Sequence, residues 1–240
     1  MTVVAVVGSK HAPGASTLAV ALAALARGGQ PVLVVEADPA GGDLAARSGL
    51  PLDPGLLTLA AAGRRGLTPQ LIEAHTQVLP NGVPALLAPA SPEHAHAAII
   101  GIGAALASSL RDRQGTTVID GGRLDARSCA AELVRSADVI VVVFRPTVEG
   151  VEHARMRLLS LSGTRVIAAM LGERPYRAAE VAAALGDIEL CVIDEDAHAA
   201  TAIGAAMPLD RWLRRTALVR SAHSLLDRIS TDSVMHEEVV

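Results

Sequence analysis

Apolar residues gather in short runs along the chain, and polar residues and helical segments separate these runs. Seven runs have the length of a strand: residues 2–8, 31–36, 83–88, 116–120, 138–144, 166–171 and 189–193. Runs without polar alternation are typical of strands that are buried on both faces, as in a parallel sheet. A helical segment follows nearly every run, which is the pattern of βαβ units. We therefore expect one α/β domain with a mostly parallel central sheet flanked by helices.

Local signals set the bounds of several helices. Ser91-Pro92 is a cap followed by a helix-starting proline, and it predicts a helix that ends near Leu110. A further helix is expected at residues 178–185, and the helical apolar spacing of residues 217–229 predicts a helix packed on the core. We divide the chain into a domain of residues 1–230 and an acidic, disordered tail of residues 231–240.

The first apolar run leads into a short turn and then into an Ala-rich helix that lasts to about Arg27. A phosphate-binding loop, G-x-x-x-x-G-K-[ST], would start at Ser9 and place its lysine at position 15. The chain has Ala15 there. Backbone N–H groups and the helix dipole at such a strand–turn–helix junction favour an anion. The sequence therefore predicts a phosphate site that lacks the lysine usually found in such a loop.

This segment resembles the loop of the ParA/MinD family of deviant Walker ATPases, which reads K-G-G-x-G-K-[ST]-[ST]. In the resemblance Lys10 corresponds to the extra lysine that reaches the partner's nucleotide across a dimer. Gly14 corresponds to the last glycine, Ser16 to the magnesium-binding hydroxyl and Thr17 to the next phosphate-contacting hydroxyl. The resemblance implies these nucleotide-binding residues: Lys10, His11, Ala12, Pro13, Gly14, Ala15, Ser16 and Thr17.

The loop departs from the family pattern at several positions. His11 and Ala12 replace two glycines, whose conformational freedom eases close approach to phosphate. Pro13 fixes φ and removes one N–H donor. Turns of small residues before helices also occur without any ligand, and this alternative stays open at the level of the loop alone.

The second apolar run ends in Glu36-Ala37-Asp38-Pro39. It resembles the D-x-D-P segment of the same family, where the second aspartate positions the attacking water or contacts magnesium. Asp38 matches that residue, and Glu36 keeps the charge of the first. The resemblance makes Asp38 and Lys10 the catalytic residues. The structural alternative is that Asp38 caps a helix that begins near Ala40.

The run at residues 116–120 ends in Asp120 and two glycines, like the Walker B strand and switch II of the family. Asp120 would hold magnesium through water, at the edge of the sheet where such folds bind ligands. We also hypothesise that Arg123, the next cation, partly replaces the missing lysine. The implied Mg²⁺ residues are Ser16, Asp38 and Asp120.

The base-binding residues of the family have only partial counterparts. Gly172 lies where the family usually has an asparagine that reads adenine. Ile193 and Asp196 match an I-P-x-D segment beside the adenine pocket, and Asp194 replaces its proline. The resemblance therefore adds Asp196 to the nucleotide-binding residues and leaves base recognition open.

Composition narrows the list of partners. The net charge of −4 gives no overall attraction to nucleic acid, and three aromatic residues offer few platforms for stacking on bases. The basic stretch at residues 211–220 allows non-specific DNA binding, but we favour a solvated helix face paired with acidic residues. Two cysteines without a C-x-x-C spacing indicate reduced thiols.

Membrane attachment is not indicated. The C-terminal tail is short and acidic, so it lacks the Lys/Arg face of an amphipathic membrane helix. No apolar stretch has membrane-spanning length, and the chain starts with a strand rather than a signal segment. We expect a cytoplasmic protein without a direct membrane anchor.

The leading hypothesis is a ParA/MinD-like switch that forms a homodimer around ATP and Mg²⁺ and positions an unidentified protein partner or cargo. Because the lysine is missing, ATP hydrolysis is expected to be weak or absent. The alternative is a pseudo-ATPase scaffold that recruits partners without nucleotide turnover. A ligase similar to dethiobiotin synthetase shares the fold class, but such enzymes depend on the missing lysine.

Overall fold

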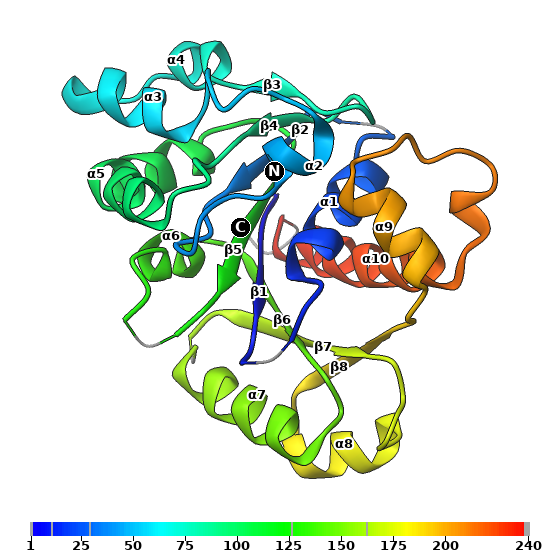
Figure 1. Cartoon of the computed structure of the whole chain (residues 1–240). Helices are drawn as coiled ribbons and strands as arrows, with labels where there is room; N and C mark the ends of the chain where they lie inside the picture. Colours follow the sequence, from blue (N-terminus) through cyan, green and yellow to red (C-terminus); the bar gives the residue numbers. More distant parts are fainter. Residues whose placement is uncertain (1, 11, 29, 126, 162, 238–240) are drawn as a thin grey trace.

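The computed structural model of the chain describes residues 2–10, 12–28, 30–125, 127–161 and 163–237. Its strands form one sheet in the order β3-β4-β2-β5-β1-β6-β7-β8, shown in Figure 1. All neighbouring strands are parallel except β3 and β4. The strands are β1 Thr2–Gly8, β2 Val32–Glu36, β3 Gln77–Val78, β4 Pro84–Leu86, β5 Thr116–Arg123, β6 Val139–Phe144, β7 Arg165–Leu171 and β8 Glu189–Ile193.

Helices cover both faces of the sheet (Figure 1). Helices α1, α2, α9 and α10 contribute to the apolar cluster on one face, and α3 to α8 contribute to the cluster on the other. The helices are α1 Ala15–Ala26, α2 Leu44–Ser48, α3 Leu56–Ala62, α4 Pro69–Ala74, α5 Pro92–Arg111, α6 Ala131–Arg135, α7 Val148–Ser160, α8 Ala178–Leu185, α9 Ala197–Gly204 and α10 Ala217–Glu237, with short 3₁₀ turns at Gly63–Arg65 and Leu213–Arg215. Among the described residues, none of these helices has the length and apolar character needed to cross a membrane.

The unbroken apolar runs follow from this layered arrangement. In β1, Val4 and Val6 belong to the cluster under α1, while Val3, Ala5 and Val7 belong to the cluster on the opposite face. Because side chains of a strand alternate between faces, a strand covered on both sides needs apolar residues at every position. The predicted single α/β domain with a mostly parallel sheet is confirmed.

Most predicted elements have counterparts, with four differences. Ser91 caps α5 as expected, since its Oγ accepts a hydrogen bond from the N–H of His94 at 3.3 Å. Strand β3 was not predicted, because it is a two-residue antiparallel edge strand. The helix expected near Ala40 begins instead at Leu44. Strand β5 continues through Gly121 and Gly122 to Arg123. Helix α10 extends beyond residue 230, and the division of the chain at that position remains a prediction.

The order of the strands changes direction at β1. Strands β5 and β2 lie on one side of it, and β6 to β8 lie on the other. Glu36 at the end of β2 is in register with Asp120 of β5, and Gly8 of β1 pairs with Arg123 after a shift in register. The carboxyl ends of the three central strands therefore meet at one edge, where open α/β sheets bind ligands.

Candidate functional site

The turn between β1 and α1 has the backbone of an anion-binding loop. The N–H of Ser9 donates to the carbonyl of Val143 at 2.9 Å, and the N–H of Ala12 donates to the carbonyl of Ser9 at 3.2 Å. Gly14 precedes the helix with a φ of 107°, a left-handed conformation that favours glycine. Within residues 2–10 and 12–28, no side chain caps the start of α1, and its first turn carries no acidic residue. The N-terminal N–H groups are therefore left for a ligand.

The loop residues differ in exposure. Lys10 is exposed, and Ala15 is buried at 7 % exposure and has no polar side chain to offer a ligand. Pro13 and Thr17 line a pocket beside the loop. The predicted contact residue His11 lies outside the described residues. Ser9, which takes the place of the first glycine of the motif, has a buried Oγ that finds no hydrogen-bond partner among the residues that the structure describes.

Asp120 is a buried carboxylate next to the start of α1. Its side chain is 1 % exposed, and its Oδ1 accepts a hydrogen bond from the N–H of Gly122 at 3.1 Å. Its Oδ2 has no hydrogen-bond partner among the described residues. Burial raises the pKa of Asp120 to about 6, although the nearby Ser16 hydroxyl lowers it. A buried carboxylate with a free oxygen is suited to bind a cation or a cation-bound water.

Asp38 lies close to the same glycine. A Cβ atom at Gly122, whose φ is 57°, would collide with the Asp38 carboxylate. Burial raises the pKa of Asp38, and the charge of Arg123 lowers it. The Oδ1 of Asp38 accepts a hydrogen bond from the N–H of Ala40 at 2.8 Å, which forms a local turn rather than a helix cap. The lack of a side chain at position 122 thus leaves room for the Asp38 carboxylate beside that of Asp120.

The oxygen ligands of this site fit magnesium. Ser16, Asp38 and Asp120 offer hydroxyl and carboxylate oxygens, which Mg²⁺ prefers. Within the described part of the chain, no group of three or more His, Cys, Asp and Glu side chains could hold a metal ion. Mg²⁺ is commonly bound by one or two carboxylates together with waters and substrate phosphates. A metal here would therefore depend on a phosphate ligand in the neighbouring loop.

Glu36 has a structural role. Its Oε1 accepts hydrogen bonds from the N–H groups of Asp43 at 2.7 Å and Leu44 at 2.9 Å. Its Oε2 accepts from the N–H of Ala88 at 2.9 Å. Burial raises the pKa of Glu36 to about 7, and these N–H contacts oppose the rise. Glu36 ties the end of β2 to the start of α2 and to the segment after β4, so it has no free oxygen for a ligand.

Two arginines bring positive charge toward the carboxylates. The guanidinium of Arg47 pairs with Asp43 at 2.6 Å, and its charge lowers the pKa of Asp120. Arg123 is exposed at the end of β5 and acts on Asp38 in the same way. The sequence pointed to Arg123 because it follows the aspartate strand. Arg47 was missed because no motif includes it.

A pocket of about 340 Å³ opens beside the loop, between α1 and the segments that follow β6, β7 and β8. Asp196 lines it, but its Oδ1 accepts a hydrogen bond from the N–H of Ala199 at 2.9 Å and caps α9. Gly172 lies next to Glu195, a pocket residue that forms an ion pair with Arg145 at 3.1 Å. Glu195 and Arg145 were missed, because they meet only in the folded chain.

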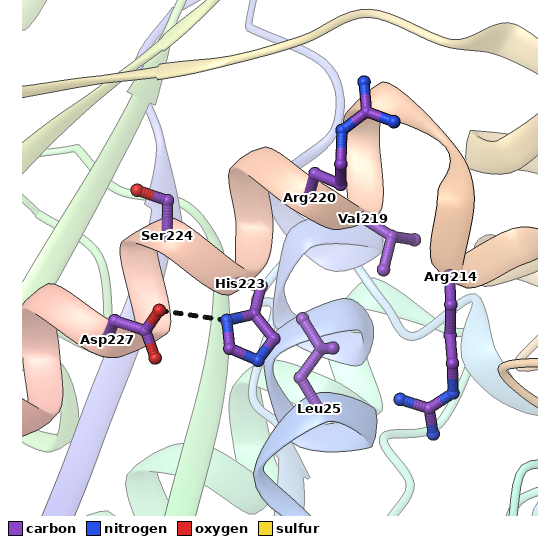
Figure 2. A pocket seen from close by; sticks show the side chains of 7 residues that line it. All are labelled: Leu25, Arg214, Val219, Arg220, His223, Ser224 and Asp227. Carbon is purple, nitrogen blue, oxygen red and sulfur yellow. Dashed lines mark hydrogen bonds and ion pairs between the residues drawn. The ribbon is translucent and has the colours of Figure 1, made fainter.

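The basic stretch near the C-terminus has local partners. Figure 2 shows Arg214 and Arg220 extending in different directions around a pocket of about 290 Å³ between α10 and the end of α1. Arg214 donates to the carbonyl of Leu209 at 2.9 Å, and Arg220 donates to the carbonyl of Arg215 at 2.5 Å. His223 pairs with Asp227 at 3.0 Å (Figure 2). These contacts agree with the favoured interpretation of a solvated helix face, and non-specific DNA binding by residues 211–220 stays a possibility that is not favoured.

The chain matches no protein-family model and no curated protein sequence. Solved structures of similar fold include MinD from Pyrococcus horikoshii OT3 complexed with Mg-ADP, at a TM-score of 0.78 and 18 % identity, covering 97 % of each chain. A ParA family ATPase from Chlorobium tepidum TLS has a TM-score of 0.75 and 18 % identity, over 94 % of this chain and 97 % of that one. A Cyanothece McdA variant in complex with ATP has a TM-score of 0.71 and 18 % identity, over 95 % and 96 %. The chain therefore has the P-loop fold of the MinD, ParA and McdA proteins.

Proposed function

We propose that this chain, which has the fold of the MinD and ParA ATPases, is a nucleotide-dependent dimerisation switch that positions a partner or cargo in the cell. The observation that carries the proposal is the free oxygen of Asp120, buried beside Ser16 where the phosphate-type loop meets α1. The N–H of Gly122 accounts for the Oδ1 of Asp120, whereas its Oδ2 has no hydrogen-bond partner in the described part of the chain. A hydrated cation bound to nucleotide phosphates would supply one.

The phosphates would bind at the start of α1. The uncapped N–H groups of the first turn and the turn at Gly14 favour an anion there. Ser16, Asp38 and Asp120 are the residues that would hold Mg²⁺, which neutralises phosphate charge. These contacts are common to ATP and GTP. ATP is the nucleotide implied by the resemblance to ParA and MinD, and an ATP or ADP complex is found among the structures of similar fold.

Hydrolysis is proposed to be weak or absent. Ala15 removes a charged hydrogen bond to phosphate, whose loss costs about 1.5–3 kcal/mol, a factor of roughly ten to a hundred in affinity. The loss in hydrolysis rate is larger than the loss in affinity. Enzymes accelerate phosphoryl transfer mainly by stabilising the charge of the transition state. Asp38 is proposed to orient the attacking water. Arg47 and Arg123 contribute positive charge at the same edge of the sheet.

Dimerisation is assigned to the exposed Lys10. By the resemblance, its ammonium would reach the phosphates bound to a second copy of the chain, so that nucleotide would join the two subunits. An exposed lysine at the tip of a phosphate loop is available for such a contact. We propose a cytoplasmic homodimer with an unidentified protein partner or cargo and no direct membrane anchor.

A titration of the purified chain with ATP and GTP analogues and Mg²⁺, followed by light scattering, tests the proposal. We expect saturable binding and a shift from monomer to dimer. Lys10→Ala should retain binding and lose the shift, because the lysine acts on the partner's nucleotide. Absence of binding of both nucleotides at millimolar concentration, with an unchanged mass, would contradict the proposal.

Absence of nucleotide binding with an unchanged mass would favour a second candidate. This candidate is a pseudo-ATPase scaffold that recruits partners without nucleotide turnover. One observation supports this candidate. Ala15 is buried, so no polar side chain at its position faces a ligand. The two candidates differ in whether nucleotide changes the oligomeric state, which the titration measures directly.

A further inference from the structure

An arginine from another helix lies beside the loop that lacks its lysine. Arg47 belongs to the last turn of α2, and its Nη1 lies 3.8 Å from the position that a Cβ atom of Gly204 would occupy. The Oγ1 of Thr17, in the first turn of α1, lies 3.7 Å from the same position. Gly204 is buried at the end of α9. Because glycine has no side chain, the guanidinium and the loop hydroxyl border one common space.

The charge of Arg47 also reaches the buried carboxylate of the site. Burial raises the pKa of Asp120 to about 6, and the charge of Arg47 opposes this rise. The Ser16 hydroxyl contacts the same carboxylate and precedes Thr17 in the chain. Arg47 is therefore close to the proposed phosphate-contacting hydroxyl and to the proposed magnesium ligand at once.

The present partner of Arg47 is one that a phosphate can replace. Its Nη2 pairs with the Oδ2 of Asp43 at 2.6 Å, and the two side chains are 40 % and 65 % exposed. Ion pairs between exposed side chains contribute little to stability, because water screens them. A guanidinium has five N–H donors in a fork that matches phosphate oxygens, and the nitrogen nearest the space beside Thr17 is Nη1 rather than Nη2.

We propose that Arg47 binds a nucleotide phosphate at the start of α1 and supplies the charge that a lysine at position 15 would supply. When nucleotide binds, the guanidinium exchanges Asp43 for phosphate oxygens, which ties α2 to the loop. The inference rests on the proposed function, since it assigns a contact to the phosphates of the proposed nucleotide. It gives to α2 the part that the sequence pattern gave to Arg123.

Nucleotide titrations of the full chain and of Arg47→Gln test the inference. Fluorescent ADP and GDP analogues are the probes, with Mg²⁺ present, because diphosphates separate binding from hydrolysis. We expect Arg47→Gln to weaken binding by about tenfold or more, since a charged hydrogen bond to phosphate is lost. The factor should be the same for every base that the original chain binds. Arg47→Lys should retain part of the affinity, because it keeps the charge and loses the fork.

Arg155→Gln is a matched control. Arg155 pairs with Glu152 at 2.8 Å, and its side chain is also 40 % exposed. It lies on α7, which packs on the opposite face of the sheet from α1 and α2. The control should bind nucleotide like the original chain. Similar melting temperatures of the two variants would show that the loss of affinity in Arg47→Gln does not come from unfolding.

Restoring the lysine of the motif gives a second test. In an Ala15→Lys background, Arg47→Gln should weaken nucleotide binding by only about threefold or less, because a neighbouring group then supplies the charge. A purely structural role of Arg47 predicts the same loss in both backgrounds. The comparison with Arg155→Gln needs no lysine at position 15, so the inference stays testable if Ala15→Lys does not fold.

The outcomes separate the inference from the proposed function. A loss of affinity in Arg47→Gln no larger than that in Arg155→Gln would overturn the assignment and leave nucleotide binding intact. A larger loss in Arg123→Gln than in Arg47→Gln would overturn it as well. If the original chain binds neither nucleotide, the inference and the proposed function fail together.

Discussion

At the scale of single residues, two buried carboxylates at the edge of the sheet have opposite surroundings. Glu36 accepts backbone hydrogen bonds on both of its oxygens, whereas the Oδ2 of Asp120 has no partner in the part of the chain that the structure describes. A buried charge without full compensation destabilises the folded chain. Retaining Asp120 in such a position is consistent with a functional requirement, because active sites commonly hold groups with shifted pKa values.

Asp120→Asn should stabilise the chain at alkaline pH. Burial raises the pKa of Asp120 from 3.8 to about 6, so the folded state binds the proton more tightly than the unfolded state. The stability contributed by this proton is present below pH 3.8 and is lost as the pH rises through 6. Urea denaturation at pH 8 should show the variant more stable by about 1–3 kcal/mol. The difference should shrink at pH 5, and a difference independent of pH would contradict the assignment.

Gly122→Ala should lower both stability and nucleotide binding. A Cβ atom at Gly122 would collide with the Asp38 carboxylate, in addition to the strain of a left-handed φ. Gly49→Ala is a control, since Gly49 is left-handed with a φ of 65° and has open space around its Cβ position. Conformational strain alone costs about 1–2 kcal/mol. Thermal unfolding of both variants should show a larger loss for Gly122→Ala, and equal losses would rule out the collision with Asp38.

At the scale of elements, Glu36 joins three segments that are distant in sequence. It connects the end of β2, the start of α2 and the segment after β4 through Asp43, Leu44 and Ala88. The loop between β2 and α2 carries Asp38. The position of that catalytic candidate therefore depends on the hydrogen bonds of Glu36.

Glu36→Gln should destabilise the chain, in contrast to Asp120→Asn. Either orientation of the amide directs an NH₂ group at a backbone N–H, so at least one hydrogen bond is lost and donors face each other. The expected cost at pH 8 is about 1–3 kcal/mol. Chemical denaturation measures it, with Glu132→Gln as the exposed control. A loss no greater than that of the control would show that the three contacts add nothing to stability.

At the scale of the whole molecule, the sequence predicted the sheet well because its central strands are buried on both faces. The runs that became β1, β2 and β6 are apolar at nearly every position and needed no tertiary information. Strand β3 was not predicted, because a two-residue strand at the edge of the sheet is too short to show a periodic pattern in the sequence. The start of α2 was misplaced because Glu36, eight residues earlier, helps to fix it through Leu44.

The sequence predicted only those residues of the site that belong to a short motif near the end of a strand. The loop from Ser9 to Thr17 follows β1, Asp38 follows β2, and Asp120 lies toward the carboxyl end of β5. Their approach at one edge of the sheet follows from a parallel arrangement. The pair of Arg145 and Glu195 joins residues that follow β6 and β8, and its contact with Gly172 depends on the fold. Contacts of this kind join separate segments, so they produce no motif of fixed spacing in the sequence.

The most direct test of the central claim is the Mg²⁺ dependence of nucleotide affinity, measured by calorimetry at pH 7.5 on the original chain and on Asp120→Asn. If Asp120 forms the metal side of a nucleotide site, chelating Mg²⁺ should weaken binding by the original chain at least tenfold. The same treatment should leave the weaker binding by Asp120→Asn nearly unchanged. Equal Mg²⁺ dependence in both proteins, or none in either, would contradict the account.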